Sequence, residues 1–172
     1  MVDRMVRAAR LDVRLYEEVE ADRGAMGQAV MVVVLSSIAA GIGGLGQIGI
    51  SGLAVAAVMS LAGWYIWAWL TYMIGTKMLP EPQTHADMGQ MLRTIGFSSS
   101  PGVIRVLGII PGLNTLVQII AQVWMLVAMV IAVRQALDYT STLRAVGVCL
   151  IGWIIQFVVL VILFGLFMKM AG

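Results

Sequence analysis

The stretch at residues 24–76 reads GAMGQAVMVVVLSSIAAGIGGLGQIGISGLAVAAVMSLAGWYIWAWLTYMIGT and contains no Asp, Glu, Lys, Arg or His. Two further charge-free stretches cover residues 106–133 and 145–168. A helix that crosses a bilayer needs about 20 mostly apolar residues, so the first stretch is long enough for two such helices and each of the others for one. Hydrophobic residues make up 60% of the chain and charged residues 12%. A soluble domain has about 45–50% apolar and about 25% charged residues, so this composition indicates a lipid-facing protein.

These stretches predict an all-α membrane protein with about five transmembrane helices, because backbone amides in hydrocarbon must be satisfied within their own segment. The predicted spans are residues 26–46, 53–78, 91–110, 113–137 and 145–168. The glycine-rich segment at residues 41–52 predicts the turn between the first two spans. We therefore expect one membrane domain over residues 26–172, preceded by a cytoplasmic segment at residues 1–25.

Residues 2–21 predict an amphipathic helix before the first span. On a helical wheel its charged side chains cluster on one side, and its apolar side chains cover most of the rest. Asp12 interrupts the apolar arc, and the alternative is that it caps a shorter helix over residues 13–21. Such a helix either lies on the membrane surface or docks a partner, or it packs under the protein's own membrane domain. The sequence leaves both arrangements open.

The third predicted span is the most polar, since it contains Ser98-Ser99-Ser100-Pro101 and Arg105. Pro101 has no backbone N–H, so we expect it to kink the helix. A re-entrant segment is the alternative. Arg105 is a candidate functional residue, because a charge in hydrocarbon is costly and no acidic residue lies in any predicted span to neutralise it. Its side chain either snorkels to the membrane surface near Pro111 or makes a functional polar contact.

Two glutamines and several small residues are the other candidates within the spans. Gln118 and Gln122 lie one turn apart on the fourth span, where we expect them to hydrogen-bond across helices. Small residues at i+4 spacing on the first two spans let helix backbones approach closely, so we expect these spans to form a tight hairpin. The helix-packing residues are Ser36, Ala40, Gly44, Gly52, Ala56 and Ser60.

Basic residues predict the orientation of the chain in the cell membrane. With five spans and a cytoplasmic N-terminus, Lys169 lies on the far side of the membrane, as does the C-terminus. The basic residues on the cytoplasmic side are then Arg4, Arg7, Arg10, Arg14, Arg23, Lys77, Arg93, Arg134 and Arg144. This strong asymmetry agrees with the rule that basic residues remain in the cytoplasm.

No set of residues suited to catalysis or metal binding stands out in the sequence. His85 is the single histidine and Cys149 the single cysteine, and neither has a partner at catalytic or ligand spacing. The formal charge of +2 is too small to indicate nucleic-acid binding. We therefore expect no enzyme activity, no metal, no cofactor and no nucleic acid.

Three stretches of the chain resemble the prokaryotic branch of the Yip family, the Ypt/Rab-interacting membrane proteins with five spans. They read RLDVRLYEEVEADRGAMGQA (residues 10–29), EPQTHADMGQMLRTIGFSSSPGVIRVLGIIPG (81–112) and VRQALDYTSTLRAV (133–146). In the second stretch, Ile95-Gly96-Phe97-Ser98 and Pro101 resemble the Gly-aromatic-Ser…Pro motif of the family. The resemblance implies a cytoplasmic N-terminus, five spans and no catalytic activity.

The eukaryotic members of that family are associated with vesicle transport, prenylated small GTPases and membrane shaping, and they form complexes with related membrane proteins. This chain departs from them, because it lacks their long hydrophilic N-terminal domain and the acidic motif near it. This departure argues against binding to a small GTPase. We expect a non-enzymatic scaffold or accessory protein that organises membrane or binds other membrane proteins, with membrane lipids, other membrane proteins or a second copy as partners. The alternative is a small channel, transporter or lipid-handling protein that uses Arg105, Gln118 and Gln122.

Overall fold

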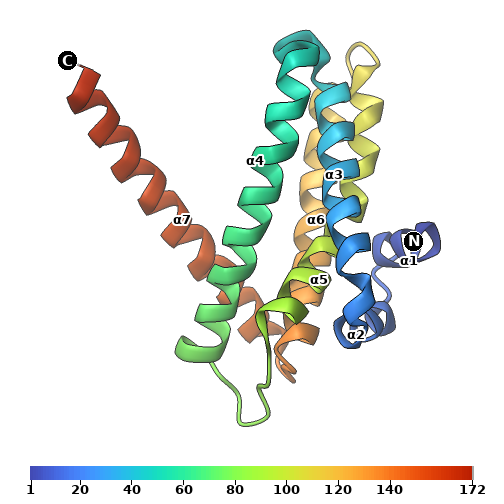
Figure 1. Cartoon of the computed structure of the whole chain (residues 1–172), viewed down its shortest axis with the longest axis vertical. Helices are drawn as coiled ribbons and strands as arrows, with labels where there is room; N and C mark the ends of the chain where they lie inside the picture. The colour runs from blue at the N-terminus through green and yellow to red at the C-terminus, as the bar shows by residue number, and fades with distance from the viewer. Residues whose placement is uncertain (172) are drawn as a thin grey trace.

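The chain folds into a bundle of helices, and the predicted all-α membrane fold is confirmed (Figure 1). The structure is a computed structural model that describes residues 1–171, without the side chains of residues 45–51, 160 and 163–171. The elements in chain order are α1 (Val2–Ala9), α2 (Val13–Ala21), η1 (Arg23–Ala25), α3 (Met26–Gly43), α4 (Leu45–Met73), η2 (Ile74–Met78), α5 (Met88–Ser98), η3 (Ser100–Ile109), α6 (Asn114–Ala136) and α7 (Thr142–Ala171).

Four helices in the described part of the chain are long and apolar enough to cross a membrane. They cover Arg23–Gly43, Gly52–Met78, Asn114–Ala136 and Thr142–Val159. The segment predicted as the third span, residues 91–110, is divided between α5 and η3. In Figure 1 these two elements follow one another beside α3, toward the loop that precedes α6.

The third segment is broken, whereas the sequence predicts one kinked helix. The α-helix ends at Ser98, and a separate 3-10 helix begins at Ser100 with Pro101 in its first turn. Proline suits this position, because the first N–H groups of a helix have no partner within the helix. The hydroxyl of Ser98 donates to the carbonyl of Ile95 at 2.7 Å, which satisfies one of the last carbonyls of α5.

The turn between α3 and α4 is shorter than predicted. The sequence predicts a turn over residues 41–52, but α3 ends at Gly43 and α4 already begins at Leu45. In lipid a helix is the way to satisfy backbone amides, so these glycines remain helical. A side chain at Gly43 would collide with the backbone carbonyl of Arg105, so glycine allows η3 to approach α3 closely here.

The N-terminal segment forms two helices, α1 and α2, so the prediction of a single helix over residues 2–21 is wrong. The alternative with Asp12 as a cap is confirmed, because its carboxylate accepts from the backbone N–H of Arg14 at 3.0 Å. The chain turns between the helices at Leu11, which has a left-handed φ of 61°. Ion pairs then join α1 to α2, with Arg7 at 2.7 Å from Glu18 and 2.9 Å from Asp12.

The helix α2 packs against the protein's own membrane domain, which is the second of the two arrangements left open by the sequence. Its side chains Leu15, Tyr16 and Val19 are fully buried, in one cluster with Phe97 of α5. Arg93 of α5 is 5% exposed and donates from Nε to the carbonyl of Val19 at 2.8 Å. A buried charge that is hydrogen-bonded to the backbone holds the two elements together.

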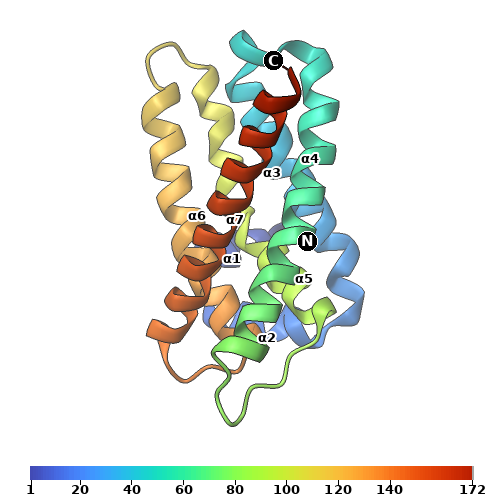
Figure 2. The same cartoon turned by 90° about the vertical axis from the view of Figure 1, so that its left-hand side faces the viewer.

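The last helix, α7, departs from the others. Near its start Ala145, Val148 and Cys149 are buried against the bundle. Farther along, α7 diverges from α4 (Figure 1), and from the side it lies in front of the bundle (Figure 2). Trp153 is already 47% exposed and Phe157 is 68% exposed. The described part of α7 is therefore held by the bundle at one end.

Candidate functional site

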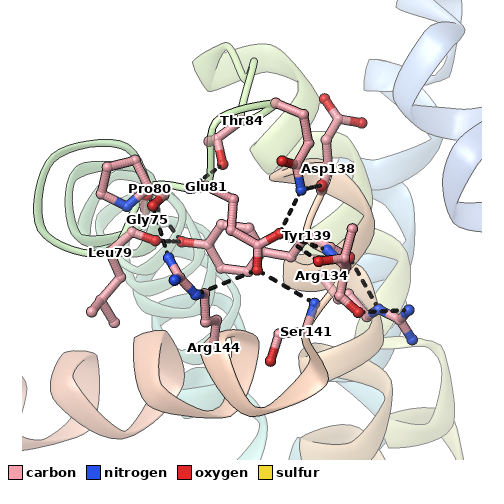
Figure 3. A network of polar contacts seen from close by, with 12 residues as sticks. Gly75, Leu79, Pro80, Glu81, Thr84, Arg134, Asp138, Tyr139, Ser141 and Arg144 are labelled. Carbon is pink, nitrogen blue, oxygen red and sulfur yellow. Dashed lines mark hydrogen bonds and ion pairs between the residues drawn. The ribbon is translucent and has the colours of Figure 1, made fainter.

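A polar cluster joins the loop after η2 to the turn between α6 and α7 (Figure 3). We call it the Glu81 network. Its members are Glu81, Gln83, Arg134, Tyr139, Thr140, Ser141 and Arg144. The two segments that it joins are far apart in sequence and meet at one end of the bundle.

Glu81 lies at the centre of this network, and its side chain is 6% exposed. Its carboxylate accepts from the backbone N–H of Thr140 at 2.9 Å and from the Thr140 hydroxyl at 2.8 Å. It also accepts from Gln83 and pairs with Arg144 at 3.4 Å. These donors, above all the Thr140 backbone N–H, lower the pKa of Glu81. Since α7 begins at Thr142, the carboxylate lies at its N-terminal end, where a negative charge is favourable.

Tyr139 closes the other side of the network. Its hydroxyl lies 2.7 Å from the carbonyl oxygen of Leu79 and 2.9 Å from that of Gly75. Burial raises the pKa of Tyr139 to about 12, so the phenol keeps its proton and donates it. Arg134 in turn donates from Nε to the Tyr139 carbonyl at 3.2 Å. Because its charges and donors are paired within the chain, this cluster has the character of a structural latch.

The second polar site is a cavity of about 360 Å³ inside the bundle, which we call the central cavity. Its polar lining is Ser36, Ser37, Ser60, Ser99, Arg105, Gln122 and Gln156. Its apolar lining includes Trp64, Trp67, Leu126, Met129 and Trp153. These residues come from α3, α4, α5, η3, α6 and α7, and most of them lie near the middle of their helices. The cavity is therefore about halfway along the bundle.

Arg105 extends into the central cavity. Its backbone lies close to Gly43, at the end of α3, but its guanidinium donates to the thioether of Met125. Met125 is midway along α6, so the side chain extends toward the middle of the bundle, whereas snorkelling requires it to extend toward Pro111. Its Nε is buried and has no hydrogen-bond partner among the described residues. All nine acidic residues of the chain belong to the described part, and none pairs with Arg105.

The structure separates the two predicted glutamines. Gln122 lines the central cavity together with Arg105. Gln118 instead lines a neighbouring cavity of about 280 Å³, next to Asn114. The amide of Asn114 donates to the carbonyl of Gly43 at 2.7 Å, which joins α6 to the end of α3.

Two of the small residues singled out from the sequence, Ser36 and Ser60, lie at contacts with a neighbouring element. The hydroxyl of Ser60 on α4 donates to that of Ser37 on α3 at 3.0 Å. Ser36 contacts the backbone of η3 at Gly102, where a larger residue would collide with it. The other members of the predicted set are placed as follows: Gly44 forms the turn, Ala40 lines both cavities, Ala56 lines the smaller one, and Gly52 lies on α4. Their role in packing stays a proposal.

Sequence reasoning missed Glu81 and Tyr139. Tyr139 lies in the stretch at residues 133–146 that carries the family resemblance, which is the one available signal for it. Nothing local to Glu81 indicates its partner Thr140, which lies 59 residues away. In the described part of the chain, no three His, Cys, Asp or Glu side chains are grouped as a metal site requires. The candidate for ligand binding is therefore Arg105, which has no ionic partner in the central cavity.

Of the comparisons with known proteins, the one with family profiles agrees with this architecture. Searches of the curated proteins and of the solved structures gave no significant match. The profile of the Yip1 domain matches residues 14–164, which include all of α2 except Val13, the Glu81 network and the central cavity. The match covers most of the chain, so the fold and the profile support the same assignment. The chain is therefore a multi-pass membrane protein that belongs to the Yip1 family.

Proposed function

We propose that the chain is a non-enzymatic scaffold or accessory protein of the cell membrane, and that it binds a transmembrane helix of another membrane protein beside α7. One observation carries this proposal. Trp153 lines the central cavity, so its side of α7 faces the bundle, and Phe157 follows on the same side one turn later. Both residues are nevertheless exposed, which agrees with the divergence of α7 from α4 along its length (Figure 1). This leaves a bundle-facing surface that the described part of the chain does not cover.

The opposite side of the opening favours a helix as the occupant. Gly63 of α4 also lines the central cavity, and a side chain added there would meet nothing within 4 Å. Ser60 and Ala56 continue the small residues along α4 toward the end where α7 is farthest away. Membrane helices associate through such small residues, because these let the backbones come close.

The proposed orientation places the Glu81 network on the cytoplasmic side. Lys77, Arg134 and Arg144 belong to the end of the bundle that contains this network. Arg23, at the start of the first long helix, precedes α3 at the same end. Basic residues of short loops remain in the cytoplasm, so the C-terminal end of α7 would lie on the opposite side.

Site-specific cross-linking in native membranes tests the proposed contact. A photo-activated residue at Phe157 should form a stoichiometric adduct with one membrane protein. The matched control is Ile120, which is exposed on α6 and points about 200° away from Gln122 around the helix axis at 100° per residue. An adduct with a second copy of the chain would mean self-association. Equal labelling at both positions would contradict a specific contact.

The competing function is a small channel or transporter, and the meeting of Arg105 and Gln122 in one cavity favours it. Purified protein in liposomes distinguishes the two. Ion or solute flux that disappears in a Gln122→Leu variant would support a transport path and overturn the scaffold proposal. Absence of flux, together with the Phe157 adduct, would support the scaffold.

A further inference from the structure

The central cavity contains a cation that has few hydrogen-bond partners among the described residues. A guanidinium has five N–H donors arranged in a rigid plane. Among the described residues, that of Arg105 reaches the sulfur of Met125, which is a weak acceptor, and its Nε reaches no acceptor. Buried polar groups are nearly always hydrogen-bonded, so the Nε of Arg105 points to an acceptor supplied from outside the chain.

The surroundings of Arg105 favour an oxyanion as that acceptor. No carboxylate of the chain pairs with it, so an anion in the cavity would meet a free positive charge. The guanidinium plane matches two oxygens of a phosphate or carboxylate at once. Neutral donors lie around the same space, namely the hydroxyls of Ser36 and Ser37, of which Ser37 accepts from Ser60 and keeps its own proton, and the amide of Gln122. A phosphate has more acceptor oxygens than a carboxylate, so it makes better use of several donors.

The rest of the lining favours a ligand with an apolar part. Trp64, Trp67 and Met129 form an apolar wall of the cavity. The volume of about 360 Å³ is enough for a head group and the first part of a tail, but not for a whole lipid. Trp153 and Gln156 line the cavity from α7, and both are exposed at the side where α7 diverges from the bundle. A lipid can therefore enter from the bilayer at this side without unfolding of the bundle.

We propose that the central cavity binds the phosphate group of an anionic membrane lipid, with the Arg105 guanidinium as its cationic partner. The Ser and Gln donors complete the contacts to the phosphate oxygens. The tail leaves the cavity beside Trp153. This proposal does not depend on a partner helix at Phe157.

The test uses the purified full chain in a neutral detergent and short-chain phosphatidylglycerol as the probe. Native mass spectrometry counts bound lipid, and tryptophan fluorescence follows the titration, since Trp64, Trp67 and Trp153 line the cavity. We expect one lipid per chain, with binding weakened about ten-fold or more by Arg105→Gln, because a hydrogen bond to a charged group is worth about 1.5–3 kcal/mol. The matched control is Arg10→Gln, an exposed arginine on the N-terminal segment, which should bind like the wild type.

A second variant keeps the test decisive if Arg105→Gln fails to fold. Gln156→Trp fills the cavity from an exposed position on α7 and leaves Arg105 in place, so it should also prevent binding. Titration with phosphatidylcholine shows whether a lipid without net charge binds as well. Competition with inorganic phosphate shows whether free phosphate occupies the site. Competition by inorganic phosphate without any lipid adduct would overturn the assignment to a lipid. Equal lipid binding by the wild type and by both cavity variants would overturn the site.

Discussion

The Glu81 network and the central cavity each hold a charged side chain inside the bundle, and they differ in how that charge is satisfied. The Glu81 carboxylate has donors from Thr140 and Gln83 and an ion pair with Arg144. The Arg105 guanidinium has a thioether and a buried Nε without a partner in the described part of the chain. A charge that is fully paired stabilises the fold as it stands, whereas an unpaired buried charge destabilises it until an acceptor binds. The difference distinguishes the structural latch from the proposed binding site.

The substitution Glu81→Ala should have the largest effect on the stability of the fold. It leaves the backbone N–H and the hydroxyl of Thr140 without their acceptor and Arg144 without its ion pair. Donors that lose their acceptor in a folded protein are costly, so we expect the unfolding midpoint in detergent to fall by several degrees. The control Glu17→Ala removes an exposed carboxylate with a single hydrogen bond from Gln135 and should have little effect. Equal effects of the two would mean that Glu81 is not a latch.

The substitution Arg105→Met should change stability in the opposite direction, as a gain. Methionine keeps an apolar chain of similar length and removes the unpaired charge. Replacing buried charged groups with apolar ones is often neutral or stabilising by about 1–4 kcal/mol, and we expect a gain of about 1 kcal/mol. Reversible unfolding in mixed micelles with added dodecyl sulfate measures the change. A loss of stability as large as that of Glu81→Ala would show that Arg105 is paired in the folded chain.

The features that the sequence predicts well are those set by the membrane as a solvent. Charge-free stretches of sufficient length indicate helices, because hydrocarbon cannot hydrogen-bond a free backbone amide. Four continuous helices follow this rule. The resemblance to the Yip family is likewise a property that can be read along the chain. The match to the Yip1 domain over residues 14–164 confirms the family.

The sequence could not predict what depends on contacts between distant residues. Glu81 and Thr140 meet across 59 residues, and no periodic pattern connects them. The direction of the Arg105 side chain depends on the space that α3, α4 and α6 leave between them, so snorkelling and a polar contact both fit the sequence. The break before Pro101 is a local effect, but whether a proline kinks a helix or ends it is decided by its neighbours. At Gly41 and Gly52 the helices continue where the glycine-rich sequence predicts a turn, and the turn is made at Gly44.

The substitution Tyr139→Phe removes a single hydrogen-bond donor from the Glu81 network and leaves the rest of the network in place. The ring stays buried, while the carbonyls of Leu79 and Gly75 lose the phenolic hydrogen bond. A neutral hydrogen bond contributes about 1 kcal/mol, so we expect a loss of stability of that size, smaller than that of Glu81→Ala. The control Tyr65→Phe changes a tyrosine that is exposed on α4, and it should leave the unfolding free energy unchanged. A larger loss from the control would refute the role given to the Tyr139 hydroxyl.

The smallest expected effect on stability concerns Glu20 of α2. Its pKa is raised, whereas that of Glu81 is lowered. Burial raises its pKa from 4.5 to about 7, with Asp138, Glu17 and Asp87 adding to the shift and Arg93 opposing it. Between these two pH values the unfolded chain loses a proton that the folded chain keeps, so stability should fall as pH rises from 4.5 to about 7. The fall should be small, because water screens a side chain that is only partly buried.

The variant Glu20→Gln should remove this fall, and the exposed control Glu17→Gln should reduce it slightly at most. Unfolding midpoints from about pH 4 to about pH 8 measure the difference, because the window covers both pKa values. Protonation of Glu81 lowers stability only below about its ordinary pKa of 4.5, at the acidic edge of this range. The two glutamates therefore act in separate pH windows and with opposite signs. A flat wild-type profile across the upper window would mean that Glu20 is hydrated in the folded chain, and that α2 packs less closely on α5 than its buried Val19 indicates.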